Sequence, residues 1–170
     1  MAFQIEPTVS KDLSHILKLN QAALPAVSNA NIENMQHFLR IVDYFRTLKV
    51  GKNIAGFLIA LTPNKDYHSL NYKWFEQKYN SFMYVDRVVI DRPFQDKGYG
   101  TAFYNDLSEF TKGKSPRITC EVNIRPPNEG SMIFHNKYGF KPVGTQTTEG
   151  GKKEVSLMEY HLPNDKNNLF

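Results

Sequence analysis

A turn that follows a hydrophobic segment has the composition of a phosphate-binding loop. It runs from Gln95 to Thr101 and contains Lys97 and two glycines, Gly98 and Gly100. Glycine lets the backbone approach a ligand closely or adopt a positive φ angle. Free N–H groups and the positive dipole end of a following helix attract phosphate oxygens. The turn therefore predicts a phosphate-bearing ligand, and an ordinary strand-to-helix turn is the competing interpretation.

The segments on both sides of this turn have the composition that such a site requires. Residues 84–90 are rich in β-branched side chains, which is typical of a strand. Pro93 lacks an N–H donor and stops the strand. A helix then begins, with Tyr99, Phe103 and Leu107 along one stripe. The expected order is therefore strand, glycine turn and helix.

The composition predicts a globular protein. With 170 residues the chain is long enough for one domain with a sizeable core. Its hydrophobic content of 41% and aromatic content of 13% argue against disorder. The net charge of +4 is mild and the basic residues are scattered, so we expect no nucleic-acid surface. The single cysteine, Cys120, excludes an intramolecular disulfide framework, and no residue spacing predicts a metal site.

The sequence lacks the marks of a membrane or exported protein. No apolar run approaches the roughly 20 residues that span a bilayer. The first residues have neither a basic region nor a long apolar region, so they do not resemble a signal peptide. We therefore expect a cytoplasmic protein that does not contact membranes.

The periodicity predicts a mixed α/β (α+β) domain over residues 1–162 and a polar tail over 163–170. Expected strands lie at 3–5, 43–49, 54–61, 84–90, 117–122, 141–148 and 154–161, and expected helices at 10–24, 31–40, 98–113 and 128–138. A helix crosses over between strands 84–90 and 117–122, so these two must be parallel in a largely antiparallel sheet. The loop at 25–30 is a candidate border of a cleft.

An aromatic-rich insert occupies residues 62–81, and 70–77 within it can form a short helix. A connection of this length in a small domain usually carries function or its own structure. The insert is either the lid or wall of a substrate cleft or an aromatic flap packed on the sheet. Trp74 is its candidate substrate contact.

Two motifs together indicate a family. The first is Gln95-x-x-Gly98-x-Gly100, and the second is Asn128-x-x-Ser131-x-x-x-His135-x-x-x-Gly139-Phe140. The pairing and the order of elements resemble the GNAT superfamily of acyl-CoA-dependent N-acyltransferases over almost the whole chain. The resemblance implies a mixed, mostly antiparallel sheet of about six or seven strands with splayed central parallel strands, flanked by about four helices.

The resemblance also implies a site for coenzyme A. The loop would bind the pyrophosphate through backbone N–H groups, and the preceding strand end would pair with the pantetheine arm. A backbone N–H near Val88 or Val89 would stabilise the oxyanion. The implied cofactor-binding residues are Val88, Val89, Ile90, Gln95, Asp96, Lys97, Gly98, Tyr99, Gly100, Thr101, Asn123 at the end of its strand, Asn128, Ser131 and Phe134.

Two carboxylates are candidates for the acceptor side of the implied reaction. Asp86 is the first candidate for the base that deprotonates the amine, and a structural salt bridge is its alternative role. Glu121 is the second; it either binds the acceptor or points to solvent. Tyr84 lies on the same strand face as Asp86 and is placed to hold a water. Tyr84, Glu121 and Trp74 are the expected substrate contacts.

The general acid is the point at which this sequence departs from the family pattern. Relatives usually carry tyrosine four residues before the Gly-Phe pair, where this chain has His135. An unperturbed histidine is a competent proton donor to a thiolate. Tyr138 lies near the same helix face and is the alternative, and a reaction without an acid is the third option.

The leading hypothesis is an acetyl-CoA-dependent N-acetyltransferase in which a primary amine of a small molecule attacks the thioester directly. The carboxylates and the aromatic insert suit a small cationic amine or an amino acid derivative. A protein N-terminus or lysine is the alternative acceptor, and a coenzyme A-binding module without turnover is the alternative from another class. A protein that binds ATP or a dinucleotide is a third interpretation, and a homodimer is left open.

Overall fold

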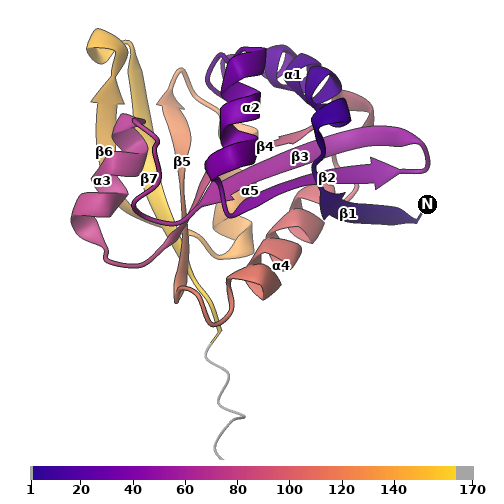
Figure 1. The fold of residues 1–170 in the computed structure, drawn as a ribbon. Coiled ribbons are helices and arrows are strands. Elements are labelled where there is room, and N and C mark those ends of the chain that lie inside the picture. The colour runs from indigo at the N-terminus through magenta and orange to yellow at the C-terminus, as the bar shows by residue number, and fades with distance from the viewer. Residues whose placement is uncertain (1, 164–170) are drawn as a thin grey trace, which may run out of the picture.

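The strands form one open seven-stranded sheet in the order β1-β2-β3-β4-β5-β7-β6 (Figure 1). This computed structural model describes residues 2–163. The strands are β1 (Phe3–Pro7), β2 (Tyr44–Val50), β3 (Asn53–Leu61), β4 (Met83–Ile90), β5 (Arg117–Arg125), β6 (Lys141–Thr148) and β7 (Lys153–His161). The α-helices are α1 (Leu13–Ala22), α2 (Ile32–Ile41), α3 (Leu70–Lys78), α4 (Tyr99–Thr111) and α5 (Glu129–Tyr138). Short 3-10 turns occur at Ser10–Asp12, Arg92–Phe94 and Glu149–Gly151.

Local sequence explains where several helices begin. The Asn31 side chain accepts from the Asn34 amide, and Asn34 reciprocates, so α2 starts in a capping box. The side chain of Ser69 caps α3 in the same way, by accepting from a backbone N–H. Asn128 caps α5, which ends at Gly139 with a φ angle of 123°. These caps fix the ends of the helices that border the site.

Helices cover both faces of the sheet. Figure 1 shows α1 and α2 above the strands β2 to β4 and α4 below them. On the α1 and α2 side, buried Ile16, Met35 and Phe38 pack with Phe57 of β3. On the other face, Phe103 and Leu107 of α4 join the largest core. The helix of the insert, α3, adds a third cluster through Tyr72 and Phe75.

The sheet splits between β4 and β5. These parallel strands pair only at Met83 with Ile118 and at Tyr84 with Thr119, and then they separate. In Figure 1 the strands β1 to β4 run across the view, whereas β5, β6 and β7 run steeply upward. The rest of β4 therefore keeps one backbone edge that is not paired with β5. β4 also carries a bulge, because its register with β3 skips Asp86.

The architecture confirms the predicted fold class and the splayed parallel pair. The sheet is mixed and mostly antiparallel, with seven strands. β5 extends three residues beyond the predicted end, so Asn123 lies inside it rather than at its end. No helix in residues 2–163 is long and apolar enough to cross a membrane. The predicted tail falls, apart from Pro163, outside the described residues.

Candidate active site

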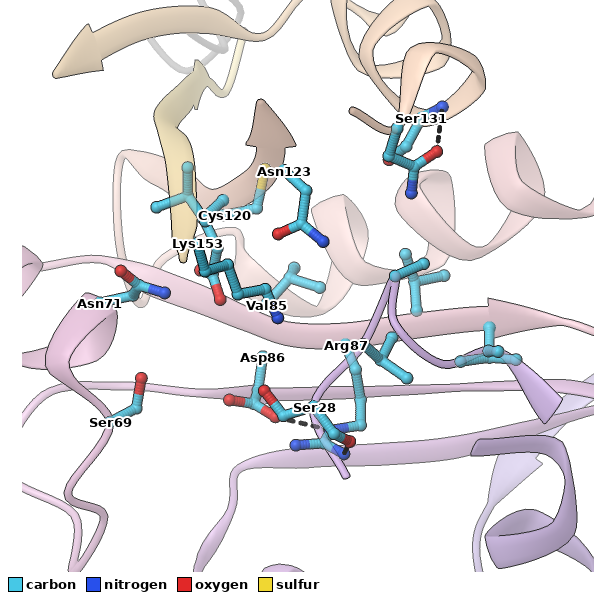
Figure 2. A pocket seen from close by; sticks show the side chains of 18 of the residues that line it. Ser28, Ser69, Asn71, Val85, Asp86, Arg87, Cys120, Asn123, Ser131 and Lys153 are labelled. Carbon is cyan, nitrogen blue, oxygen red and sulfur yellow. Dashed lines mark hydrogen bonds and ion pairs between the residues drawn. The ribbon is translucent and has the colours of Figure 1, made fainter. Parts of the chain in front are cut away.

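A cavity of about 620 Å³ occupies the opening between β4 and β5 (Figure 2). Segments far apart in the sequence line it: the 26–28 part of the α1–α2 loop, residues 67–71 of the insert, and parts of β4, β5 and β7. The predicted border at 25–30 and the start of the insert thus both reach the cavity. The walls carry polar and charged side chains, among them Asp86, Arg87 and Glu121.

A second hollow of about 700 Å³ lies between the start of α4, the end of β4 and α5. It includes the backbone of the predicted phosphate loop and the aromatic ring of Phe134. Both hollows are lined by the same six residues at their junction: Val88, Ile90, Gln95, Asn128, Ser131 and His135. They therefore form one continuous groove that passes through the opening in the sheet.

The glycines at the start of α4 leave its first N–H groups open. Gly98 has a φ angle of 83°, and α4 has no side-chain cap from any described residue. A helix leaves its first four N–H groups without intrahelical partners. The Cβ of a larger residue at position 100 would lie 3.0 Å from the ring of Phe134, so Gly100 keeps this ring close to the helix. The arrangement is suited to an anion with several oxygens.

The free edge of β4 presents regularly spaced donors to the groove. The Asp91 N–H donates to the Ala55 carbonyl of β3 over 2.8 Å. Backbone direction alternates along a strand, so the N–H groups of Val88 and Ile90 point to the opposite edge, which is the open one. The Ile90 carbonyl on that edge accepts a 2.9 Å hydrogen bond from the Gln95 side chain. Of the two predicted oxyanion donors, Val88 is the one with this orientation.

Asp86 is engaged by protein groups on both carboxylate oxygens. The Tyr67 hydroxyl donates to one oxygen, and the Arg87 Nε donates to the other over 2.7 Å. Both side chains of the Asp86–Arg87 pair are only 4% exposed. Arg87 also donates to the Asn20 side chain and to the Ser28 carbonyl, so it ties β4 to α1 and its loop. The bulge in β4 brings these two consecutive side chains to the same side of the strand.

Glu121 has a different environment, because it forms no ion pair with any basic side chain of residues 2–163. The Tyr84 hydroxyl donates to its carboxylate at 2.7–2.8 Å. Burial, and secondly the nearby negative charge of Asp86, raise the pKa of Glu121 to about 8. Hydrogen bonds from Tyr84 and Asn71 oppose this rise of the pKa. Glu121 can therefore exchange a proton near neutral pH.

The ring of His135 is bonded on both nitrogens. Its Nδ1 lies 2.7 Å from the Ser131 carbonyl, which can only accept, so Nδ1 carries the proton. The Nε2 then accepts from the Tyr104 hydroxyl at 2.7 Å. Burial lowers the pKa of His135 and raises that of Tyr104, so both groups are neutral. Tyr138 lies further along α5, with its hydroxyl bonded to Asn105 of α4.

Comparison with known proteins identifies the family. Residues 16–140 match the model of the acetyltransferase (GNAT) family. The chain belongs to the GNAT family. No curated protein matches the chain at a significant level.

Solved GNAT-like structures share the fold along nearly the whole chain. The ribosomal-protein-S18-alanine N-acetyltransferase from Escherichia coli is 16% identical with a TM-score of 0.71, and the match covers 99% of both chains. Ard1 from Thermoplasma volcanium is 15% identical with a TM-score of 0.78, over 96% of this chain and 99% of that one. Arabidopsis thaliana NAA60, solved with acetyl-CoA, is 13% identical with a TM-score of 0.74, over 94% and 99%.

The groove of this GNAT protein fits the diphosphate and thiol arm of coenzyme A. Open N–H groups at the start of α4 suit phosphate oxygens, and the free edge of β4 suits an amide-bearing arm. Most of the predicted cofactor residues line the two hollows. Lys97 is exposed and does not line either one. Asn128 and Ser131 bond each other in the helix cap, and Asn123 donates to the Pro25 carbonyl at 3.2 Å.

Asn71, Tyr104 and Lys153 are among the cavity residues that were not predicted, and one predicted contact lies elsewhere. Trp74 does not line the cavity; its indole packs against Gly144 of β6, where a Cβ would approach it to 2.6 Å. Asn71, one turn earlier on α3, faces the cavity instead. Tyr104 lies at the same helical spacing on α4 as the buried core residues, so nothing in the sequence distinguished its hydroxyl from a core side chain. Lys153 follows the Gly150-Gly151 turn, and its position in the sequence does not distinguish it from the neighbouring Lys152.

Proposed function

We propose that this protein transfers an acetyl group from acetyl-CoA to the primary amine of a small molecule. The observation that carries the proposal is the position of Glu121. Its carboxyl group lines the same cavity as Val88, at the free edge of β4. The groove then continues without interruption to the open N–H groups of α4. A proton acceptor, an oxyanion donor and a phosphate site thus lie along one path.

On this proposal each part of the groove has one task. Acetyl-CoA, when bound, supplies an activated acetyl group as a thioester. The N–H groups of α4 hold the pyrophosphate, and the N–H of Val88 stabilises negative charge on the acyl oxygen. The free edge of β4 aligns the arm in an extended form, as an added strand would be aligned. The chain then needs only to deprotonate the amine.

We assign the general base to Glu121 rather than to Asp86. A base works best when its pKa is close to the working pH, and Glu121 has a pKa raised to about 8. Asp86 holds the buried Arg87 and accepts from Tyr67, so protonating it would break a neutralised pair. Asp86 in this assignment is a positioning residue. Its charge also contributes to the raised pKa of Glu121.

In the proposed mechanism neither His135 nor Tyr138 donates a proton to the thiolate. His135 holds its only ring proton on the Ser131 carbonyl and fixes the Tyr104 hydroxyl at the cavity wall. Tyr138 bonds Asn105 and lies 3.3 Å from the Ser108 hydroxyl, on the α4 side. Burial raises the pKa of Tyr138, which weakens it as an acid.

Replacing Tyr138 by phenylalanine is therefore expected to change kcat by less than about threefold. A true general acid contributes roughly 10²–10⁴-fold, so the two roles give clearly different rates. Steady-state release of coenzyme A thiol measures kcat, and thermal unfolding reports any loss of packing against α4. A fall of 100-fold or more in a folded variant would make Tyr138 the acid.

The function itself is tested with acetyl-CoA and a panel of amines, by following release of the free thiol and the mass of the product. Acetylated product with at least one small amine is expected. Calorimetric binding of coenzyme A with no product from any amine or peptide would favour a binding module without turnover. Product only from peptides would favour the alternative acceptor, a protein N-terminus or lysine. Binding of ATP in preference to coenzyme A would reject the family mechanism.

A further inference from the structure

The positive charge of Lys153 lies at the cavity without an ion-pair or hydrogen-bond partner among residues 2–163. Lys153 is the first residue of β7, and Figure 2 shows its amino group directed into the cavity. No described residue forms an ion pair or hydrogen bond with it. Lys152, its neighbour in the sequence, is exposed and does not line the cavity. The chain therefore directs one of two consecutive lysines inward.

The ion pairs of the described residues at the cavity do not include Lys153. Glu121, the carboxyl group deeper in the cavity, is bonded by Tyr84, and its pKa is raised to about 8. Asp86 and Arg87 neutralise each other in a pair that is 4% exposed. His68 bonds Asp66 at 3.2 Å. Glu149 is an exposed residue at the rim, in the turn before β7. A cation next to a half-buried hollow attracts an anion, because the low dielectric strengthens the interaction.

The sheet register places Lys153 and Glu121 on the same face. Glu121 is paired with Leu157 of β7, and Asn123 is paired with Val155. Lys153 lies two residues beyond Val155, so its side chain leaves the sheet on the side of Val155. Leu157 and Lys153 lie four positions apart, which is roughly 13 Å along the strand. Both side chains nevertheless line one cavity, with Glu121 deeper and Lys153 towards the turn at Thr148.

We propose that the acceptor is a zwitterion of the amino acid class, whose amine faces Glu121 and whose carboxylate is bound by Lys153. Asn71, Ser69 and Asn123 supply neutral polar groups to the same cavity (Figure 2). A polyamine would place a second cation near Lys153, and a peptide would replace the carboxylate by a neutral amide. The inference rests on the acetyltransferase function proposed above and specifies its substrate class.

The test compares each acid with its own amide. The probes are free α-amino acids together with β-alanine and γ-aminobutyrate, which vary the distance between amine and carboxylate. Each probe is paired with its carboxamide, and kcat/KM is measured for the wild type, Lys153→Met, Lys153→Arg and Lys152→Met. A hydrogen-bonded ion pair that is lost here should lower kcat/KM for the acid by about 10- to 100-fold.

The expected result is a change of preference, not of activity in general. The wild type should favour the best acid over its amide, and Lys153→Met should lose this preference while its rate with the amide stays within about threefold. Lys153→Arg should keep much of the preference, and Lys152→Met should behave as the wild type. Equal use of acid and amide by the wild type would overturn the inference and leave the acetyltransferase function intact. If none of the probes, peptides or other amines causes thiol release, both the inference and the acetyltransferase function are overturned.

Discussion

Replacing Glu121 by glutamine is expected to lower kcat by about 10²–10⁴-fold, the usual contribution of a positioned base. Glutamine has nearly the same shape and still accepts from the Tyr84 hydroxyl, so the cavity should keep its form. Coenzyme A binding should stay within about threefold, because Glu121 is not part of the groove at α4. Steady-state kinetics and calorimetry with coenzyme A measure the two effects separately.

The pH profile identifies the residue behind this rate loss. Only deprotonated Glu121 can accept the proton of the amine, so wild-type kcat/KM should rise with pH and level off above its pKa of about 8. The variant should lose this limb of the profile. Glu109→Gln is the matched control, since Glu109 is exposed on α4 and pairs with Lys112 at its surface. An unchanged limb in Glu121→Gln, with full loss in Asp86→Asn, would move the base to Asp86.

The pH dependence of folding stability provides a second test of Glu121→Gln. The pKa of Glu121 is higher in the folded protein than its ordinary value of 4.5, so the folded state binds the proton more tightly than the unfolded chain. The wild type should therefore lose stability as pH rises between about 4.5 and 8. Glutamine has no such titration, so the Tm of the variant relative to the wild type should rise between these pH values and level off above about pH 8. This opposite behaviour of rate and stability is typical of a catalytic group held in an unfavourable environment.

Replacing Arg87 by methionine is expected to cost about 3–5 kcal/mol of unfolding free energy. The substitution leaves the Asp86 carboxylate buried without its cation, and it also removes donors to Asn20 and Ser28. The α1–α2 loop that borders the cavity should then lose its attachment to β4. Urea unfolding followed by circular dichroism gives the free energy.

A partly exposed pair of the same type provides the control. Arg46 donates to Asp106 at 2.8 Å, and these side chains are 27% and 30% exposed. Arg46→Met should cost about 1 kcal/mol or less. The double variant Asp86→Asn with Arg87→Met should recover part of the loss, because no unpaired charge remains. Equal losses at Arg87 and Arg46 would mean that burial does not set the strength of the pair.

The sequence predicted the elements of this fold well because each carries a local signal. The apolar run of β3 indicated a central strand, and all seven of its last residues are buried. Asn31 and Asn128, the first residues of two predicted helices, are the caps of α2 and α5, which begin one residue later. The parallel pair followed from the crossover helix between β4 and β5, since chain connectivity alone requires it.

The environment of each site residue was harder to predict because it depends on contacts between distant segments. Nothing near Glu121 in the sequence shows that Tyr84 and Asn71 bond it, although these contacts help to set its pKa. The bulge at Asp86 placed two successive side chains on one side, which a period of two does not anticipate. Lys153 could be placed only through the register of β7 with β5.

The opening between β4 and β5 also bears on how substrates enter the site and how products leave it. The acceptor cavity is bordered by the α1–α2 loop and the insert, whereas the groove at Gly98 is bordered by α4 and α5, on the other face. The two hollows therefore meet across the sheet at the opening that Val88 and His135 line. If the proposed function holds, acetyl-CoA and the amine reach this opening from opposite faces of the sheet, and either product can leave without displacing the other.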